Sequence, residues 1–377
     1  MQINLWSYAK LSAAKNAIVS SIVCKIVLIL ELDEVGKVEE SEVLVMDCHH
    51  IPKIELHCHL DGSVRPKTII DLAKKDGIEL PSYDLEEIEK LSIAPMECSS
   101  LDEYLKRFDL PLAVMQSWEN IEKIVFELME DALFENVKYM EIRFAPVLHT
   151  KNGMSQKEVI QSAINGIKRA EMFFNIEATL ILCCMKHLSE EDAIETIEAG
   201  KEFIGKGVSA VDLAGGEEEG FADKFVNAMK LAKEYGYHIT VHAGEAASAQ
   251  NVIDSVQKLG AERIGHGVRI ENNEEAYNLV KEKGVMLELC PTSNVQTKAV
   301  DSMKNHPIRR FLDDGIKVSV NTDNRTVSNT SMSDEFEVCR DVFGFGEEEF
   351  RKVYADSVNA LFVDDKKKEK LLRVLNK

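Results

Sequence analysis

From residue 51 to the carboxyl end, short runs of apolar and β-branched residues alternate with longer stretches in which apolar residues recur at helical spacing. No block of consecutive strand-like or helix-like segments interrupts this alternation, which is typical of parallel sheets built from βα units. The pattern predicts strands at residues 53–59, 137–144, 176–184, 208–213, 238–242, 263–266, 285–290 and 316–321. Between them it predicts helices, for example at residues 118–135, 156–173 and 221–235.

Eight predicted strands indicate a closed barrel rather than an open sheet. The roughly 325 residues that contain them suit a (β/α)8 TIM barrel with insertions, whereas an open doubly wound sheet is more often shorter or divided into two halves. No low-complexity tract or linker rich in proline and serine divides this region. We therefore expect an α/β protein in which residues 47–377 form a single (β/α)8 TIM barrel domain.

The connection after the first predicted strand is unusually long, at about 75 residues where a simple helical crossover needs far fewer. We expect a helical insertion there, on the carboxyl-end face where such barrels place their active sites. Leu101, Tyr104, Leu105 and Phe108 recur at helical spacing within the insertion, which makes them candidates for a lid over the substrate. The alternative is that these side chains simply face a hydrophobic core.

The segment before the first strand is the one place where a targeting signal could lie. Its apolar run at residues 17–32 is interrupted by Lys25, is shorter than the roughly 20 residues of a spanning helix, and is followed by acidic residues without an A-x-A-like cleavage site. We therefore expect neither a secretory signal nor a membrane anchor. Met46 stands just ahead of the first strand, so we expect the functional chain to start at Met46, with residues 1–45 upstream of it. In the domain division we assign residues 1–46 to an N-terminal extension.

Composition narrows the possible partners. Lys and Arg number 45 against 65 Asp and Glu, a formal net charge of −20, which disfavours binding to nucleic acid or to anionic membranes. The eight cysteines are scattered, with no CxxC pair and no dense disulfide framework, so a reducing cytoplasm fits best. We expect a cytoplasmic protein that acts on a small molecule. Its oligomeric state is left open.

Two histidines end the first predicted strand. Alternate residues of a strand share a face, so Ile54, Leu56 and Cys58 are expected to point outward, and His57 and His59 inward at the carboxyl end. Their backbone positions are about 7 Å apart, which allows both rings to share one cation. A lone HxH pair is only moderately specific, because surface histidines produce the same pattern by chance.

Two further residues have the same placement. His242 ends the fifth predicted strand, and Asp323 follows the eighth on the inward-facing parity. Together with His57 and His59 they form a nitrogen and oxygen site suited to Zn²⁺, with an open position for water. Each has a structural alternative, since His242 could be a core histidine and Asp323 a helix cap.

His266 lies between two glycines after the sixth strand and could orient a hydroxide ion. We interpret the other six histidines as structural or surface residues; they are His49, His50, His149, His187, His238 and His306.

These residues belong to six segments through which the chain resembles adenosine deaminases, a family of barrel metallohydrolases that act on adenosine, AMP or adenine. The segments are LHCHLDGS at 56–63, YMEIRFAP at 139–146, DLAG at 212–215, VHAGE at 241–245, GHG at 265–267 and NTD at 321–323. The resemblance covers nearly everything from residue 51 onward. It implies zinc-dependent hydrolytic deamination of adenosine and 2′-deoxyadenosine to inosine and ammonia, in purine salvage.

The resemblance and the chemistry together suggest catalytic roles. Zinc on His57, His59, His242 and Asp323 would generate hydroxide at neutral pH for attack on purine C6. Glu245, three residues after a ligand, would be the acid that protonates N1, kept neutral by burial, and the alternative is a solvated residue that opens the next helix. His266 and Asp323 would hold and deprotonate the water.

The resemblance also implies substrate contacts. Gly215 would bond purine N3 through its backbone, and Asp61 would bond the ribose 5′-hydroxyl, where adenine deaminases usually carry glutamate. We also expect His59, Asn324 and the four lid candidates to contact the substrate.

The chain departs from the usual family pattern at two positions. Asn324 occupies a position where a second aspartate usually contacts N7, and an amide can donate there as well. Gly216 occupies a position where members of the family frequently have an acidic residue. The alternative function is deamination of adenine or of a modified adenine nucleoside on the same scaffold.

Overall fold

The fold is given by a computed structural model that describes residues 46–96 and 98–376. The predicted N-terminal extension, residues 1–46, lies outside the described residues apart from Met46. The boundary that we assigned at residue 46 therefore stays a prediction.

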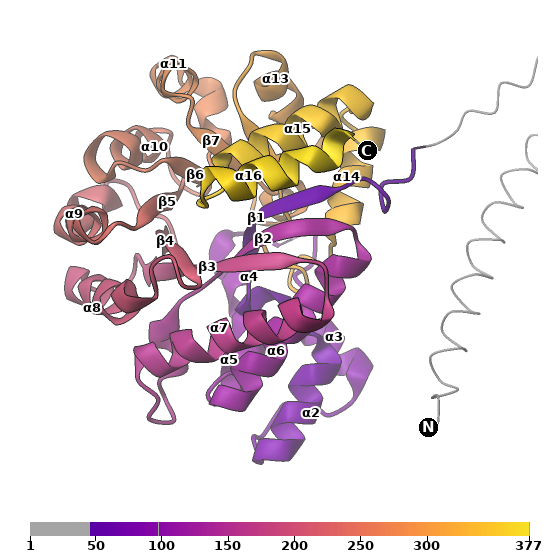
Figure 1. Cartoon of the computed structure of the whole chain (residues 1–377), viewed down its shortest axis with the longest axis vertical. Helices are drawn as coiled ribbons and strands as arrows, with labels where there is room; N and C mark the ends of the chain where they lie inside the picture. The colour runs from indigo at the N-terminus through magenta and orange to yellow at the C-terminus, as the bar shows by residue number, and fades with distance from the viewer. Residues whose placement is uncertain (1–45, 97, 377) are drawn as a thin grey trace, which may run out of the picture. The chain divides into compact units, whose positions relative to one another are not determined.

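Eight parallel strands form one sheet whose spatial order is the order along the chain, from β1 to β8 (Figure 1). The strands are β1 Lys53–His59, β2 Val137–Phe144, β3 Glu177–Met185, β4 Val208–Ala214, β5 His238–Ala243, β6 Arg263–His266, β7 Met286–Leu289 and β8 Val318–Val320. They are almost entirely buried, as expected for parallel strands covered on both faces. Helices surround them, so the predicted (β/α)8 TIM barrel is confirmed.

The barrel closes where β8 meets β1, and this closure involves the candidate ligands themselves. The His59 backbone N–H donates to the Asp323 carbonyl at 2.7 Å, and the Asp323 N–H donates to the His57 carbonyl at 3.0 Å. Nearer the middle of the strands, the Asn321 side chain takes the place of a backbone hydrogen bond between β8 and β1, because its Oδ1 accepts from the Leu56 N–H at 2.9 Å. Closure of the sheet therefore brings the last predicted ligand next to the first two.

The insertion after β1 is helical, as predicted. The α-helices are α2 Pro66–Asp76, α3 Leu85–Ser92, α4 Leu101–Leu105, α5 Asp109–Val114, α6 Trp118–Phe134, α7 Gln156–Phe173, α8 Glu190–Gly200, α9 Val226–Tyr235, α10 Gln250–Asp254, α11 Glu274–Lys283, α12 Pro291–Gln296, α13 Ile308–Asp313, α14 Met332–Asp341, α15 Glu347–Ala360 and α16 Asp365–Leu372. Helices α2 to α6 all lie between β1 and β2. The single helix predicted at 221–235 is instead a 3-10 helix, η5 Phe221–Phe225, followed by α9.

The middle of the barrel is filled by paired charges. Arg143 donates to Asp212 at 2.9 Å and to Glu288 at 2.8 Å, and Arg263 donates to Glu288 at 2.7 Å and also to Glu141. All five side chains are buried. Buried charges of this kind are tolerated only when paired, and this layer of ion pairs lies under the carboxyl ends of the strands.

Within the described residues, no helix is both long and apolar enough to cross a membrane. The cysteines in this part of the chain are all buried and form no disulfide with one another.

Candidate active site and metal centre

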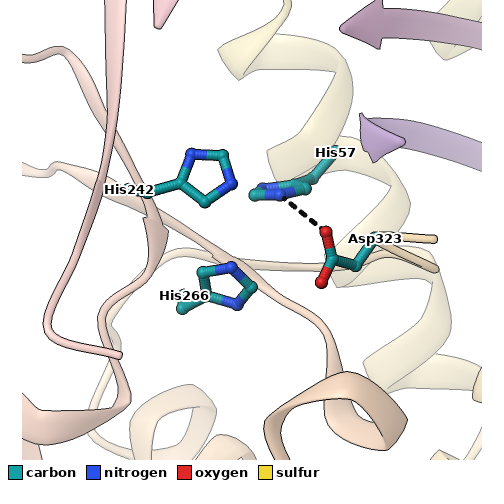
Figure 2. Close-up of side chains that lie close together, drawn as sticks. All are labelled: His57, His242, His266 and Asp323. Carbon is teal, nitrogen blue, oxygen red and sulfur yellow. Dashed lines mark ion pairs between the residues drawn. The ribbon is translucent and has the colours of Figure 1, made fainter. Parts of the chain in front are cut away.

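The residues predicted to bind metal come together at the carboxyl ends of β1, β5 and β8. The Nε2 atoms of His59 and His242 are 3.2 Å apart, and Oδ1 of Asp323 lies 3.3 Å from His57 Nε2 and 3.5 Å from His59 Nε2. His266, from the end of β6, joins the cluster. Figure 2 shows its ring together with those of His57 and His242 near the Asp323 carboxylate. One potential ligand atom from each of these four residues lies within 4.8 Å of the others, and His59 is outside this group.

The separations of 3.2–3.5 Å among His57, His59, His242 and Asp323 fit a single bound metal ion. Ligand atoms about 2.0–2.2 Å from one tetrahedral ion lie about 3.3–3.6 Å from each other. His57 supplies a second indication, because its buried Nε2 points into the cluster, lies 3.3 Å from Oδ1 of Asp323 and makes no hydrogen bond of normal geometry among the described residues. Burial also lowers the pKa of His59 well below its ordinary value, which leaves the ring neutral, as a metal ligand must be.

Two carboxylates orient the histidine rings from behind. Glu288 on β7 lies 2.9 Å from Nδ1 of His57, and Asp212 on β4 lies 2.9 Å from Nδ1 of His242. Such hydrogen bonds fix the ring orientation and direct Nε2 at the metal. The sequence pattern did not predict either role. The available signal was a lone acidic residue within a buried strand, as Glu288 is between Leu287 and Leu289.

Asp323 is held in position by its backbone and by a serine. Its φ of +60° lies in the left-handed region, and its Oδ2 accepts a hydrogen bond from Ser293 Oγ at 2.5 Å. Burial opposes ionisation, but the adjacent His57, with Nε2 3.3 Å from Oδ1, outweighs burial and holds the pKa of the Asp323 carboxyl well below its ordinary value. The carboxylate is therefore charged across the physiological pH range.

The glycines around His266 make room for the cluster. A Cβ atom on Gly265 would lie 2.9 Å from Cε1 of His57, so the close approach of the rings requires glycine there. His266 itself has a φ of +63° and accepts a hydrogen bond at Nδ1 from the Asn294 amide at 2.9 Å. Its Nε2 is therefore protonated in the neutral ring and faces Glu245, with Oε2 3.5 Å away.

A cavity of about 200 Å³ opens onto this cluster. Glu245 is buried in its wall, with only 5% of the residue exposed, and Gly215 lines it with a φ of +90°. Asp61 also lines the cavity. Its Oδ1 is buried and has no hydrogen-bond partner among the described residues, and burial raises the pKa of its carboxyl to about 7. An unpartnered carboxyl oxygen in a cavity wall is suited to a polar group of a ligand.

The four lid candidates all border the same cavity. Leu101, Leu105 and Phe108 are half-buried, whereas Tyr104 is buried and packs in a small hydrophobic cluster with Ala94 and Val327 among its members. The core-facing alternative therefore describes Tyr104 well, although its ring also lines the cavity. Movement of this segment as a lid stays a prediction.

Asn324 lies at the cavity wall beside Tyr104. Its Nδ2 donates to the Tyr104 hydroxyl at 3.0 Å, and that hydroxyl is also 2.6 Å from Ser328 Oγ. One of the two amide N–H groups of Asn324 is therefore engaged within the protein, and the second is the one available to a ligand.

The remaining histidines divide into two groups. His49, His50 and His238 are exposed, and His149 and His306 are buried, as the structural or surface interpretation requires. His187 differs, because it is exposed at the rim of the cavity, where a Cβ atom on Gly215 would lie 3.6 Å from its Nδ1. Its position in a loop after β3 could have indicated this, since loops at that end of a barrel form the active site.

A (β/α)8 barrel with a buried histidine and aspartate cluster at the carboxyl ends of its strands has the architecture of metal-dependent enzymes of the TIM-barrel class. Comparison with known proteins narrows the class. The family model "Adenosine deaminase" matches residues 52–377. An adenosine deaminase of Clostridium perfringens is 54% identical over 326 residues, which cover 86% of this chain and 98% of that protein. The chain belongs to the adenosine deaminase family.

Other similarities agree with this assignment. An adenosine deaminase of Clostridium botulinum is 51% identical over 326 residues, covering 86% of this chain and 98% of the relative. Among solved structures, an adenine deaminase from Arthrobacter aurescens has a TM-score of 0.80 at 28% identity, with 86% of this chain and 98% of that chain covered. The N6-methyl-AMP deaminase of Arabidopsis thaliana has a TM-score of 0.77 at 27% identity, with 87% and 97% covered.

Proposed function

We propose that this protein catalyses the hydrolytic deamination of adenosine and 2′-deoxyadenosine to inosine and ammonia. The observation that carries the proposal is the convergence of His57, His59, His242 and Asp323 beside a cavity that also contains Glu245. The adenosine deaminases of two Clostridium species, at 54% and 51% identity, support the same reaction.

Zinc is the metal that suits this ligand set best. Three imidazoles and one carboxylate form a borderline nitrogen and oxygen site, and catalytic zinc sites keep a position for water. Bound zinc would lower the pKa of a water molecule so that hydroxide is available at neutral pH. The neutral His59 ring and the ionised Asp323 carboxylate are both in the protonation state that such a site needs.

Side chains of the protein would then donate and accept the protons that the reaction moves. Addition of the hydroxide oxygen to purine C6 places negative charge on N1, and the Glu245 carboxyl would donate a proton there. The bond from C6 to the amino nitrogen would then break, and the departing nitrogen would take the proton removed from the water to leave as ammonia. As the C6 carbonyl of inosine forms, the C6 hydroxyl would return its proton to the Glu245 carboxylate. His266 and Asp323, which face the same point of the cavity, would hold the water and transfer that proton.

Three groups would orient the nucleoside. The Gly215 backbone N–H would bond purine N3, and the free N–H of Asn324 would reach N7. Asp61 would accept the ribose 5′-hydroxyl, and its unpartnered buried oxygen supports this role. His59, Leu101, Tyr104, Leu105 and Phe108 would cover the ring as apolar and aromatic walls.

Deamination of adenine or of a modified adenine nucleoside is the second candidate, since an adenine deaminase and an N6-methyl-AMP deaminase share the fold at TM-scores of 0.80 and 0.77. Ammonia release from adenosine, 2′-deoxyadenosine, adenine and AMP, with and without a chelator, separates the candidates. We expect the two nucleosides to react fastest and the chelator to abolish activity. Faster turnover of adenine would contradict the role of Asp61.

Glu245→Gln tests the proton donor in the same assay. Removing a group that donates a proton in the transition state is expected to lower kcat on the order of a thousandfold or more, with zinc content unchanged. Near-full activity in this variant would mean that the N1 proton comes from another group.

A further inference from the structure

A second carboxylate, which the proposed mechanism does not use, binds the turn that carries Glu245. Glu217 lies on the loop after β4, and its two oxygens accept the backbone N–H groups of residues 244–247 at 2.7–3.0 Å. These four residues form a bend outside any helix or strand. Successive N–H groups of this kind form a concave anion site, which here contains a side chain of the protein itself.

The same carboxylate anchors a third element. The buried Asn251 of α10 donates through Nδ2 to Glu217 Oε1 at 2.9 Å and to the Glu218 carbonyl at 3.0 Å, and its Oδ1 accepts from the Gly220 N–H at 2.9 Å. Five N–H groups therefore converge on the Glu217 carboxylate. The loop after β4 and the turn after β5 are joined as one unit.

This unit contains two of the proposed purine contacts. Gly215 and Gly216, just before Glu217 in the chain, line the cavity, as does Glu245, whereas Glu217 itself is outside the cavity lining. N3 and N1, the atoms that Gly215 and Glu245 would contact, belong to the same six-membered ring of the purine. The separation of the two loops therefore has to match the size of that ring.

We propose that Glu217 is a positioning residue that sets the distance between the Gly215 backbone and the Glu245 carboxyl, and so aligns the proton donor with N1. The inference rests on the proposed function, because it takes N1 as the target of Glu245. Glu217 acts only through the backbone of residues 244–247 and through Asn251, without touching the substrate.

The surrounding charge supports a permanently ionised Glu217. Burial disfavours the charge, but Lys186 and the N–H groups of the turn outweigh burial and lower the pKa of the Glu217 carboxyl. Lys186 is buried over the Phe221 ring, 4.5 Å from its centroid, and its Nζ has no hydrogen-bond partner among the described residues. The lysine thus balances the carboxylate from a distance and leaves both carboxylate oxygens free for the turn.

Glu217→Gln is the direct test, since it replaces one oxygen by an NH2 group that must face N–H donors. We expect kcat for adenosine to fall on the order of 10- to 100-fold, with a smaller change in KM, because misalignment of a catalytic group affects the transition state most. Amide hydrogen exchange at residues 244–247 should accelerate, while zinc content stays at the wild-type level.

Glu219→Gln is the matched control. Glu219 is exposed and accepts from the N–H and Oγ of Ser248, one residue beyond the turn, so its loss should leave kcat unchanged and accelerate exchange only at Ser248. A melting temperature for each variant separates local loosening from global destabilisation, and Glu217→Asp provides a second variant that keeps the charge. Wild-type kcat in a folded Glu217→Gln protein would overturn the proposal.

A double variant separates this proposal from the proposed function. If Glu217 acts through Glu245, adding Glu217→Gln to Glu245→Gln should cause little further loss of kcat. Fully additive losses would contradict positioning through Glu245. Absence of adenosine deamination in the wild type would instead refute the proposed function, while the exchange experiment would still report whether Glu217 holds the turn.

Discussion

Strand β5 carries a histidine at each end, and the two have different environments. His242 at the carboxyl end is buried, bonded to Asp212 and 3.2 Å from His59 Nε2. His238 at the amino end is exposed, lies 2.9 Å from Glu262 and stacks on the Phe362 ring at 4.4 Å between centroids. Both rings have a carboxylate partner, and both occupy the same parity of one strand.

The two histidines therefore differ in how many other potential ligands point at the same spot, and not in residue type. At the carboxyl end, groups from β1, β6 and the chain after β8 point at the same spot as His242. At the amino end, His238 lies beside a neighbouring acid, Glu262, and a ring from the segment after α15. A histidine with an acidic partner is common in proteins, whereas several ligand atoms directed at one point indicate a metal centre.

Exchanging each histidine for alanine should give the largest contrast. His242→Ala removes a proposed zinc ligand and should lower adenosine deamination on the order of a thousandfold or more, with loss of bound zinc. His238→Ala should keep activity within about twofold, because its site makes no contact with the cavity. Zinc content and kcat of the two purified variants test this contrast, and equal losses would remove the distinction between the two ends of β5.

The carboxylates behind the two rings should show a smaller contrast. Asp212→Asn weakens the orientation of His242 and should reduce zinc affinity on the order of 10- to 100-fold. Glu262→Gln, the matched change behind His238, should leave zinc affinity unchanged. Competition with a chelator of known affinity measures both variants. A zinc affinity of Asp212→Asn equal to that of the wild type would show that Asp212 serves only the ion pair with Arg143.

Substitution of Asp61, a proposed substrate contact at the carboxyl end of the barrel, should affect nucleoside and free-base substrates differently. Asp61→Ala removes the proposed ribose acceptor and should raise KM for adenosine roughly tenfold, as expected for loss of a hydrogen bond to a carboxylate. Adenine lacks ribose, so any residual turnover of adenine should not change, and Asp61→Asn, which keeps an acceptor oxygen, should lose less. Equal effects on nucleoside and base would contradict the ribose contact.

The last contrast concerns protein stability rather than activity, at a histidine without a carboxylate partner among the described residues. His149 is buried, bonds the Met115 carbonyl at 3.0 Å, and has its pKa lowered by burial from 6.5 to about 4. The unfolded chain binds a proton at His149 below pH 6.5 and the folded protein only near pH 4, so acidification across that interval favours unfolding. The exposed His238 has no comparable burial.

His149→Gln should therefore flatten the fall of the unfolding free energy between pH 6.5 and 4, by roughly 3 kcal/mol at most. Denaturant titrations at several pH values measure this slope, and His238→Gln is the control that should leave it almost unchanged. An identical slope in wild type and His149→Gln would show that protonation of His149 does not contribute to acid unfolding.

Much of the fold could be predicted because alternation and strand length are local properties. The bounds predicted for β1, β2 and β6 agree with the structure, and so does the helical insertion after β1. β8 is shorter than predicted, at Val318–Val320, and just beyond its end the Asn321 side chain accepts from the Leu56 N–H and donates to the Leu289 carbonyl. Asp323 can then adopt its left-handed backbone next to His57.

The site was only partly predictable, for a physical reason. The sequence shows which face of a strand each side chain occupies and how near it lies to the carboxyl end. These two properties identified the candidate ligands. The partners behind them depend on which strands are neighbours and on register, so Glu288 behind His57 could not be assigned. The same holds for the Asn294 amide that links His266 to His306, and for Glu217 beneath the Glu245 turn.

The most direct test of the account is the position of zinc in crystals of the protein, located by anomalous scattering at the zinc absorption edge. We predict one peak about 2.0–2.2 Å from Nε2 of His57, His59 and His242 and from a carboxylate oxygen of Asp323, with His266 left outside the coordination sphere. A peak bound by His266 in place of His59, or fully active crystals with no zinc at this position, would contradict it.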